Sequence, residues 1–277
     1  MDTFKDKIAI VTGAASGIGR ALALALAERG ATVIAADKNE AGAGETARLC
    51  GGRSEARLLD VTAAADVLSL VSETAEKFGR LDYVFNNAGI AVGGEARDLS
   101  LEHWRRTIDV NLWGVIHGCH AAYRIMAAQG FGHIVNTASL AGIIPTPGEV
   151  PYTTTKFAVV GLSRSLRSEG RALGVKVSVV CPGFVATGIF KAATLVNMDV
   201  TEVMKNLPFK MPEPGPVARD ILAGVAKNKE VIVVTGHGKA FLALFRHGPP
   251  GLFSLLQDKM IADMRKIRRV PIGKERP

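Results

Sequence analysis

The 277-residue chain is poor in the features that mark secreted, membrane-spanning and repetitive proteins. Its three cysteines, Cys50, Cys119 and Cys181, fit no metal-ligand spacing, and this odd, scattered set predicts reduced thiols in a cytoplasmic protein. No uncharged apolar run approaches the ~20 residues that cross a bilayer. The charged N-terminus has no apolar signal-peptide core. Repeats and low-complexity blocks are also absent, so we do not expect an array of small units.

The net positive charge is small outside the last forty residues, because acidic residues nearly balance the basic ones there. The formal net charge is +8, but residues 236–277 contain nine Lys/Arg against three Asp/Glu and therefore contribute +6. A nucleic-acid-binding protein would spread basic charge over a broader surface. We therefore expect no nucleic-acid partner, and we treat residues 237–277 as a basic extension of a main domain at 1–236.

Seven short apolar runs alternate with helical patterns along the main domain. They read KIAIVTG, ATVIAAD, EARLLDV, LDYVFNNAG, GHIVNTAS, VKVSVVCPG and EVIVVTG. Near-continuous hydrophobic strands separated by helices predict a parallel sheet with helices on both faces. Right-handed crossovers make this a doubly wound, seven-stranded α/β sheet of the Rossmann type, whose ligands bind beyond the carboxyl ends of the strands.

The segment TGAASGIGR follows the first strand and opens a helix. Gly13, Gly17 and Gly19 allow a sharp turn and a close approach to a pyrophosphate, and the helix directs its free N–H groups at the phosphates. The glycines alone would also fit a tight turn without a ligand. Their position favours a dinucleotide site.

Asp37 ends the second strand, about 20 residues beyond the glycines, where a carboxylate accepts hydrogen bonds from both ribose hydroxyls of an adenosine. It would repel a 2′-phosphate and so predicts NAD over NADP. Lys38 beside it could tolerate that phosphate. The alternative role for Asp37 is a helix N-cap.

Tyr152 and Lys156 are four residues apart on a predicted helix, and so share one face about 6 Å apart along the axis. A tyrosine has a pKa of about 10. A neighbouring ammonium is expected to lower that pKa and make the phenol a usable acid or base. Ser139, at the end of the fifth strand, can polarise a substrate oxygen. Asn111 lies inside a long helical pattern from Leu101 to about Gln129, where a small amide is unfavourable.

The ordered motifs TGAASGIG, DV, NNAG, YTTTK and PG, with Asn111 and Ser139 between them, resemble the short-chain dehydrogenase/reductase family over roughly Lys5–Gly236. The resemblance implies that Tyr152 is the general acid/base, that Ser139 steadies the reacting oxygen, and that Asn111 holds a water linking Lys156 to solvent. The implied catalytic set is Asn111, Ser139, Tyr152 and Lys156. The implied cofactor contacts are Gly13, Ser16, Gly17, Ile18, Gly19, Asp37, Asp60, Val61, Asn87, Ala88, Gly89, Tyr152, Lys156, Pro182, Gly183, Val185 and Thr187.

The function implied is hydride transfer between NAD(H) and an alcohol or ketone, without a metal. Two alternatives stay open: a 3-oxoacyl thioester reductase that uses NADPH, and a non-catalytic dinucleotide-binding sensor. Family resemblance also implies a homo-oligomer, either a dimer or a tetramer.

Residues 184–216 predict the substrate class. This connection shows no clear strand and is rich in Phe, Met, Leu and Val, including Phe184, Phe190, Leu195, Met198, Met204, Leu207, Phe209 and Met211. Such a segment suggests a cover over an apolar pocket. We expect an apolar secondary alcohol or ketone of the steroid, retinoid, terpenoid or fatty-chain type. The alternative is that the segment only packs on the core.

The extension at 237–277 contains an amphipathic, basic helical pattern. Its apolar positions are Phe253, Leu256, Met260, Met264 and Ile267. Three roles fit this pattern: packing against another subunit, lying on an anionic membrane surface, and covering the substrate pocket of its own chain.

Overall fold

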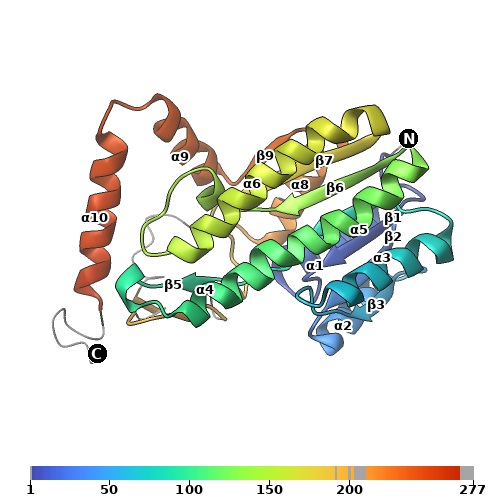
Figure 1. Cartoon of the computed structure of the whole chain (residues 1–277), viewed down its shortest axis with the longest axis horizontal. Helices are drawn as coiled ribbons and strands as arrows, with labels where there is room; N and C mark the ends of the chain where they lie inside the picture. Colours follow the sequence, from blue (N-terminus) through green and yellow to red (C-terminus); the bar gives the residue numbers. More distant parts are fainter. Residues whose placement is uncertain (1, 191, 199–200, 203–209, 269–277) are drawn as a thin grey trace.

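A parallel sheet of seven strands forms the centre of the computed structural model, which describes residues 2–190, 192–198, 201–202 and 210–268 (Figure 1). The strand order is β3-β2-β1-β4-β6-β7-β9. This is the predicted doubly wound sheet, and each predicted apolar run forms one strand. The strands are β1 (Ile8–Thr12), β2 (Thr32–Asp37), β3 (Glu55–Leu58), β4 (Tyr83–Asn86), β6 (Gly132–Thr137), β7 (Val175–Pro182) and β9 (Val231–Val234).

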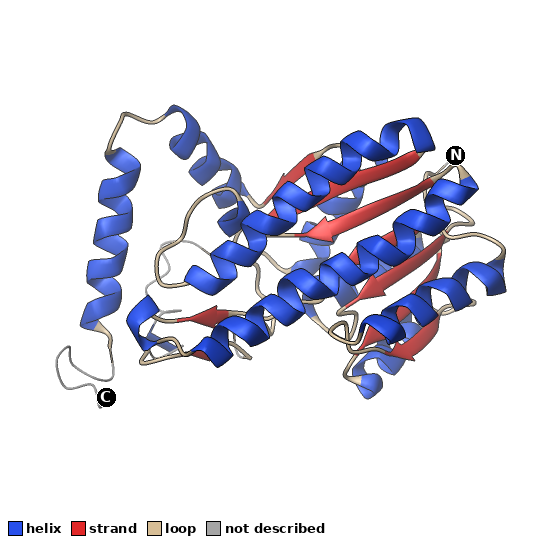
Figure 2. Ribbon diagram, viewed as in Figure 1, coloured by secondary structure: helices blue, strands red, loops and turns tan. Residues whose placement is uncertain are grey.

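Helices cover both faces of the sheet (Figure 2). One layer consists of α1 (Gly17–Glu28), α2 (Glu40–Cys50) and α8 (Pro214–Ala226), and the other of α3 (Ala64–Phe78), α4 (Leu101–Ile108), α5 (Gly114–Gln129) and α6 (Val150–Gly170). Alternate side chains of β1 point toward opposite helical layers. Ala9 and Val11 belong to the core beneath α1, whereas Ile10 belongs to the core beneath α5. Burial on both sides explains why the strand is apolar throughout.

The predicted long helix from Leu101 to Gln129 is interrupted. A π-helix at Asp109–Trp113 separates α4 from α5, and Asn111 lies within it, fully buried. π-helical turns are rare and occur frequently at functional sites. The sequence prediction of a continuous helix is therefore wrong at its centre.

A second sheet, which the sequence did not predict, joins two connections. Its parallel strands are β5 (Val92–Gly93) and β8 (Thr194–Leu195). The segment 184–216 thus contains a short strand, contrary to prediction, and its last residues begin α8. Two-residue strands give no readable alternation, because their pairing depends on segments a hundred residues apart. Of the apolar residues predicted for this cover, Met204, Leu207 and Phe209 lie outside the described residues.

The C-terminal extension forms α9 (Gly236–His247) and α10 (Leu252–Lys266). Gly248, Pro249, Pro250 and Gly251 separate them, because proline cannot continue a helix. The rings of Phe245 and Phe253 meet edge to face at 4.9 Å across this break. In Figure 1, α10 stands at the end of the molecule toward which the strands of the sheet point. No helix within the described residues is both long and apolar enough to span a membrane.

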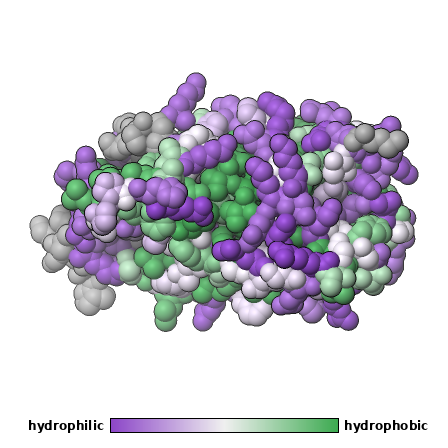
Figure 3. All heavy atoms as spheres, turned by 90° about the horizontal axis from the view of Figure 1, so that it is seen from above, coloured by the Kyte–Doolittle hydropathy of each residue, from purple (hydrophilic) through white to green (hydrophobic). Residues whose placement is uncertain are grey.

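The surface is not uniformly polar. Seen from above, hydrophobic side chains gather in a patch among hydrophilic ones (Figure 3). Large apolar side chains that remain exposed include Leu101, Trp113 and Phe157. Such residues are available for contacts with other molecules.

Candidate active site

A cavity of about 1350 Å³ opens at the carboxyl ends of the strands. Every predicted cofactor-binding residue lines it, as do the predicted catalytic residues other than Asn111. The fold therefore brings together residues that are spread from Gly13 to Thr187 in the sequence. This placement agrees with the rule that doubly wound sheets bind ligands at this edge.

The turn between β1 and α1 can be built only with glycine. Gly13 and Gly17 have φ of +68° and +55°, in the left-handed region that other residues rarely adopt. A Cβ atom on Gly13 would lie 2.9 Å from the Cα of Ala88, and one on Gly19 would lie 2.1 Å from the carbonyl oxygen of Gly13. The turn thus packs tightly on the loop after β4 while α1 begins at the cavity.

Asp37 presents its carboxylate to the cavity at the end of β2. Its two oxygens accept the backbone N–H groups of Ala15 and Asn39, each at 2.9 Å. The N-cap of α2 is Asn39, whose side chain accepts from Gly42, so Asp37 does not have the alternative role of helix cap. A carboxylate has about four acceptor sites, which leaves two of them for a diol. Lys38 lines the same region.

Asp60 and Val61 lie beside this end of the cavity. Hydrogen bonds from the amide and hydroxyl of Thr62, at 2.9 and 2.8 Å, lower the pKa of Asp60. The carbonyl of Val61 is 3.0 Å from Nδ1 of His117, and its side chain packs against Gly114. Asp60 is therefore held by the turn before α3, and Val61 is held by α5.

Thr12 organises the loop after β4, although it was not among the predicted site residues. Its hydroxyl accepts the backbone N–H groups of Asn87 and Ala88, at 3.0 and 3.1 Å. Nδ2 of Asn87 also donates to the Thr12 carbonyl at 3.1 Å. Asn86 instead bonds Asn136 at 2.9 Å within the sheet, so the two adjacent asparagines differ in role. A threonine directly before the glycine turn was the available signal.

Ser139, Tyr152 and Lys156 meet in the middle of the cavity. Nζ of Lys156 lies 5.5 Å from the ring centre of Tyr152 and donates to the carbonyl of Thr137 at 3.0 Å. Ser139 forms the N-cap of the short helix η3 (Leu140–Gly142) and accepts the Ala141 N–H at 3.2 Å. α6 thus supplies two of the three groups, and the loop after β6 supplies the third.

Burial controls the titration of these groups. It raises the pKa of the Tyr152 phenol above its usual value, and a hydrogen bond with Ser139 only partly opposes this. Burial also lowers the pKa of Lys156 to about 8. The prediction that Lys156 lowers the pKa of Tyr152 is therefore wrong for the protein groups alone, because both charged forms lose hydration. The protein by itself keeps the phenol protonated.

Asn111 lies beneath the cavity rather than in its wall. Its Oδ1 accepts the Ile90 N–H at 2.8 Å, and its Nδ2 donates to the Ile90 carbonyl at 2.9 Å. A Cβ atom on Gly89 would lie 3.2 Å from Oδ1 of Asn111 and 3.6 Å from Nζ of Lys156. Gly89 thus lies between the side chains of Asn111 and Lys156, with little free space on either side. The water relay through Asn111 stays a prediction.

His237, from the start of α9, supports the loop after β7 and was also missed. Its Nε2 accepts the Phe184 N–H at 2.9 Å and lies 3.1 Å from the hydroxyl of Thr235. A Cβ atom on Gly183 would lie 2.5 Å from that nitrogen. Burial lowers the pKa of His237, which favours the neutral, accepting ring. No local motif identified this histidine, because it lies 53 residues from its partner.

Glu149, one turn before Tyr152, is the third missed residue. It is the N-cap of α6, yet its side chain makes no capping hydrogen bond, and it lines the cavity. Burial raises the pKa of Glu149 to about 7, and its charge raises the pKa of Tyr152. Its position three residues before the Tyr-Lys pair was the readable signal.

Apolar side chains form the outer part of the cavity. The segment after β7 contributes Phe184, Phe190, Leu195 and Met198, among others. All five apolar positions predicted for the extension, Phe253, Leu256, Met260, Met264 and Ile267, line the same cavity. Of the three roles considered for the extension, this arrangement favours covering the pocket of its own chain.

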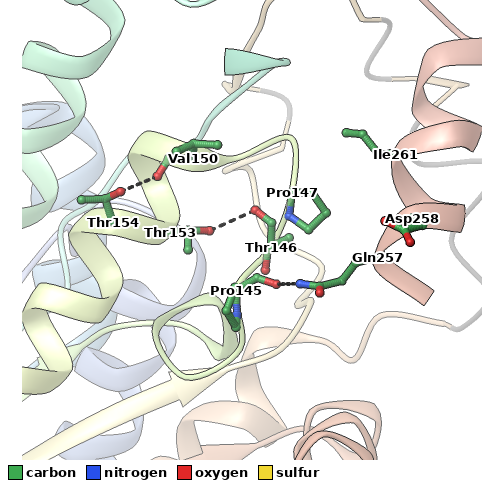
Figure 4. Close-up of a pocket in the computed structure, with 9 residues that line it drawn as sticks. All are labelled: Pro145, Thr146, Pro147, Val150, Thr153, Thr154, Gln257, Asp258 and Ile261. Atoms are coloured by element: carbon green, nitrogen blue, oxygen red, sulfur yellow. Dashed lines mark hydrogen bonds between the residues drawn. The ribbon is translucent and has the colours of Figure 1, made fainter. Parts of the chain in front are cut away.

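A smaller cavity of about 380 Å³ lies between α10 and residues 145–154 (Figure 4). Nε2 of Gln257 donates to the carbonyl of Pro145 at 2.6 Å across it. On the other side, Thr153 donates to the Thr146 carbonyl at 3.3 Å. The loop at residues 145–149 therefore links the first turn of α6, which contains Tyr152, to α10.

A tight glycine turn at a helix start, a carboxylate at the end of β2 and a Tyr–Lys pair in one cavity define an oxidoreductase that uses a nicotinamide dinucleotide. Residues 7–196 match the family model for short chain dehydrogenase. The chain belongs to this family.

Individual relatives cover most of the chain. It is 37% identical over 254 residues to the "Putative oxidoreductase SadH" of Mycobacterium tuberculosis, covering 89% of this chain and 92% of that protein. It is 36% identical to the 3-oxoacyl-[acyl-carrier-protein] reductase FabG of Haemophilus influenzae, covering 74% and 84%. A solved short-chain dehydrogenase/reductase from Burkholderia phymatum in complex with NAD superposes with a TM-score of 0.80 at 29% identity, covering both chains completely.

Proposed function

We propose that the protein transfers hydride between NAD(H) and an apolar secondary alcohol or ketone of the steroid, retinoid, terpenoid or fatty-chain type. One observation carries the proposal. Ser139, Tyr152 and Lys156 share a cavity whose outer wall is apolar and whose far end holds Asp37 and the glycine turn. Phenylalanine and methionine side chains adapt to bulky apolar ligands.

The glycine turn, Asp37, Asp60 and Thr187 would hold the dinucleotide, which supplies the hydride donor or acceptor when bound. In reduction, Tyr152 is the general acid, since the protein keeps its phenol protonated, and it donates its proton to the substrate oxygen. Ser139 hydrogen-bonds the same oxygen and steadies its charge. Lys156 lies close enough to stabilise the phenolate that remains, and in oxidation these proton transfers run in reverse.

A panel of alcohols and ketones tests this proposal. The purified protein is incubated with NAD, NADP or their reduced forms, and nicotinamide absorbance is followed for apolar secondary alcohols, short polyols and the matching ketones. The proposal expects the highest kcat/KM for apolar alcohols with NAD. Faster turnover of short polyols than of apolar alcohols would overturn the substrate class.

A second candidate is reduction of a 3-oxoacyl thioester. The relative from Haemophilus influenzae is named as such a reductase, and a 3-ketoacyl-(acyl-carrier-protein) reductase from Brucella melitensis complexed with NADH superposes with a TM-score of 0.76 at 26% identity. A 3-oxoacyl thioester in the same panel decides between the two. Higher kcat/KM on the thioester, especially with NADPH, would favour this candidate.

We also propose that the protein is a cytoplasmic homo-oligomer, a dimer or tetramer. The exposed Trp113 and Phe157, from the π-helix and from α6, are suitable contact residues. Light scattering coupled to size-exclusion chromatography measures the mass directly. A monomer at micromolar concentration would contradict the proposal.

A further inference from the structure

The end of α10 is attached to the main domain by a cluster of ion pairs. Nη2 of Arg268 bonds an oxygen of Asp98 at 3.2 Å, and Nη1 bonds the other oxygen of Asp98. Nη1 also lies 3.3 Å from Glu95. Arg265, one turn earlier, reaches Glu95 through two nitrogens at 3.1 and 3.2 Å. We call these four residues the latch.

Three side chains of the latch, those of Arg268, Asp98 and Glu95, are buried, whereas that of Arg265 is 48% exposed. The side chains of Arg268 and Asp98 are each 4% exposed, and that of Glu95 is 10% exposed. By contrast, Lys266 pairs with Asp263 on its own helix and is 74% exposed. Burial alone would raise the pKa of Glu95, but hydrogen bonds from Arg265 and Arg97 hold it below its usual value. A bidentate, buried arginine pair fixes geometry more firmly than an exposed lysine pair.

The latch also joins the two covers of the cavity. Glu95 and Asp98 follow β5, whose partner β8 belongs to the segment after β7. Arg268 makes an antiparallel backbone bridge with Met198 of that segment, and Met198 lines the cavity. The segment 92–98 therefore anchors both the cover after β7 and α10.

Between its two ends, α10 makes few polar contacts with the part of the domain that the structure describes. At one end is the Gly-Pro-Pro-Gly break, and along its length are the Gln257–Pro145 hydrogen bond and Met264, which packs on Gly148. Every residue of α10 keeps part of its surface exposed to solvent. The helix therefore buries little apolar surface. The buried ion pairs at its end contribute much of the free energy that keeps it in position.

We propose that Arg268 is a positioning residue for the substrate: its ion pairs with Asp98 and Glu95 hold α10 as a wall of the cavity and so determine how tightly bulky substrates bind. The inference rests on the proposed function and deepens it. Substrates large enough to reach Met260 and Met264 depend on the latch. Small secondary alcohols, which need only Ser139 and Tyr152, do not depend on it.

The test compares Arg268→Met with a matched control, Arg246→Met. Both remove a guanidinium from the extension and keep an apolar stem. Arg246 is exposed on α9 and does not line the cavity. Removing one partner of a buried pair leaves the other charge uncompensated, which is strongly destabilising locally. Arg268→Lys, which keeps the charge but loses the bidentate fork, should fall between wild type and Arg268→Met.

The first readout is hydrogen exchange, which needs no substrate. In Arg268→Met, the amides of 252–266 should exchange at least about ten-fold faster, while those of β1 and α6 stay unchanged. Arg246→Met should match the wild type. Unchanged exchange in α10 of Arg268→Met would overturn the inference. If Arg268→Met does not fold, the same measurement on Arg268→Lys decides the matter.

The second readout is kinetic. For a bulky apolar alcohol, Arg268→Met should raise KM at least about ten-fold, whereas for 2-propanol both kcat and KM should stay within about two-fold of wild type. NADH affinity should not change. Equal losses on both alcohols would overturn the inference. If the wild type oxidises neither alcohol, the proposed function fails, and hydrogen exchange alone then decides whether the latch holds α10.

Discussion

The two halves of the cavity are built in different ways. We name the halves after the ligands proposed for them. The cofactor half consists of strand ends and short turns, in which Thr12, Gly13, Gly19 and Asn87 contact one another at hydrogen-bonding or van der Waals distance. The substrate half consists of a long connection after β7 and a helix outside the central sheet, joined to the domain by ion pairs and apolar side chains. The packing of the cofactor half allows few other side chains. Side chains of the substrate half can be replaced without disturbing the sheet.

This contrast explains how one fold can keep the same cofactor site while its substrate site changes. The residues proposed to hold the cofactor are positioned by the backbone itself. Residues that select a substrate lie on elements added to the sheet, where new side chains cost little stability. Substitutions in the two halves test this contrast.

Tyr152→Phe removes the proton donor and should lower kcat by about 10²–10⁴-fold. It should leave NADH affinity within two-fold, because the ring and Lys156 remain in place. Steady-state kinetics and fluorescence titration of NADH measure the two quantities. Loss of NADH binding in step with activity would show that the two halves are not separable.

Gly19→Ala should break the cofactor half, because the new Cβ would lie 2.1 Å from the Gly13 carbonyl oxygen. We expect a destabilisation of about 1–3 kcal/mol and at least about ten-fold weaker NADH binding. Thermal unfolding and titration test this. Gly44→Ala is the matched control, since open space surrounds Gly44 within α2, and it should stabilise the protein by about 0.5–1 kcal/mol. Equal effects of the two substitutions would refute the tight-turn argument.

Asp37→Ala should change cofactor choice without changing substrate choice. Loss of the carboxylate removes the diol acceptor and the repulsion of a 2′-phosphate, while Lys38 remains. We expect the ratio of kcat/KM for NAD to that for NADP to fall about ten-fold, a difference of ~1.4 kcal/mol. Both cofactors are compared on one alcohol. An unchanged ratio, or a wild type that already prefers NADP, would contradict the assignment of Asp37.

Glu149→Gln should have the smallest effect on turnover and should act mainly on pH dependence. The pKa of Glu149 is raised from 4.5 to about 7 in the folded protein, so the folded state binds an extra proton between these values, and this contribution to stability is lost as pH rises through 7. The variant should therefore gain in Tm relative to wild type from pH 4.5 to about 7. The pH profile of oxidation should also move to lower pH, because the Glu149 charge raises the pKa of Tyr152. A constant Tm difference across this range would disprove the titration.

The sequence was sufficient for the sheet, and the residues it predicted for cofactor binding all line one cavity, while their binding role stays a prediction. Period, glycine spacing and strand-end polar residues are local signals, and each predicted strand is present. Local signals do not report His237 or Arg268, because their partners lie 53 and 170 residues away. The pKa of Tyr152 was predicted in the wrong direction for the protein groups alone, because spacing to Lys156 is visible in the sequence whereas burial is not.

The π-helix at Asp109–Trp113 contains one residue that the packing of the two flanking helices does not require. A π-turn accommodates one residue more than an α-turn, so α4 and α5 keep the relative orientation that a regular helix one residue shorter would give them. Deleting Leu112 should therefore preserve the packing of α4 on α6 and of α5 on α3, while Asn111 moves away from Ile90. A deletion within α5 would instead rotate the rest of that helix by about 100°. The extra residue of the π-helix thus positions Asn111 at the site, whereas α4 and α5 on either side stabilise the fold.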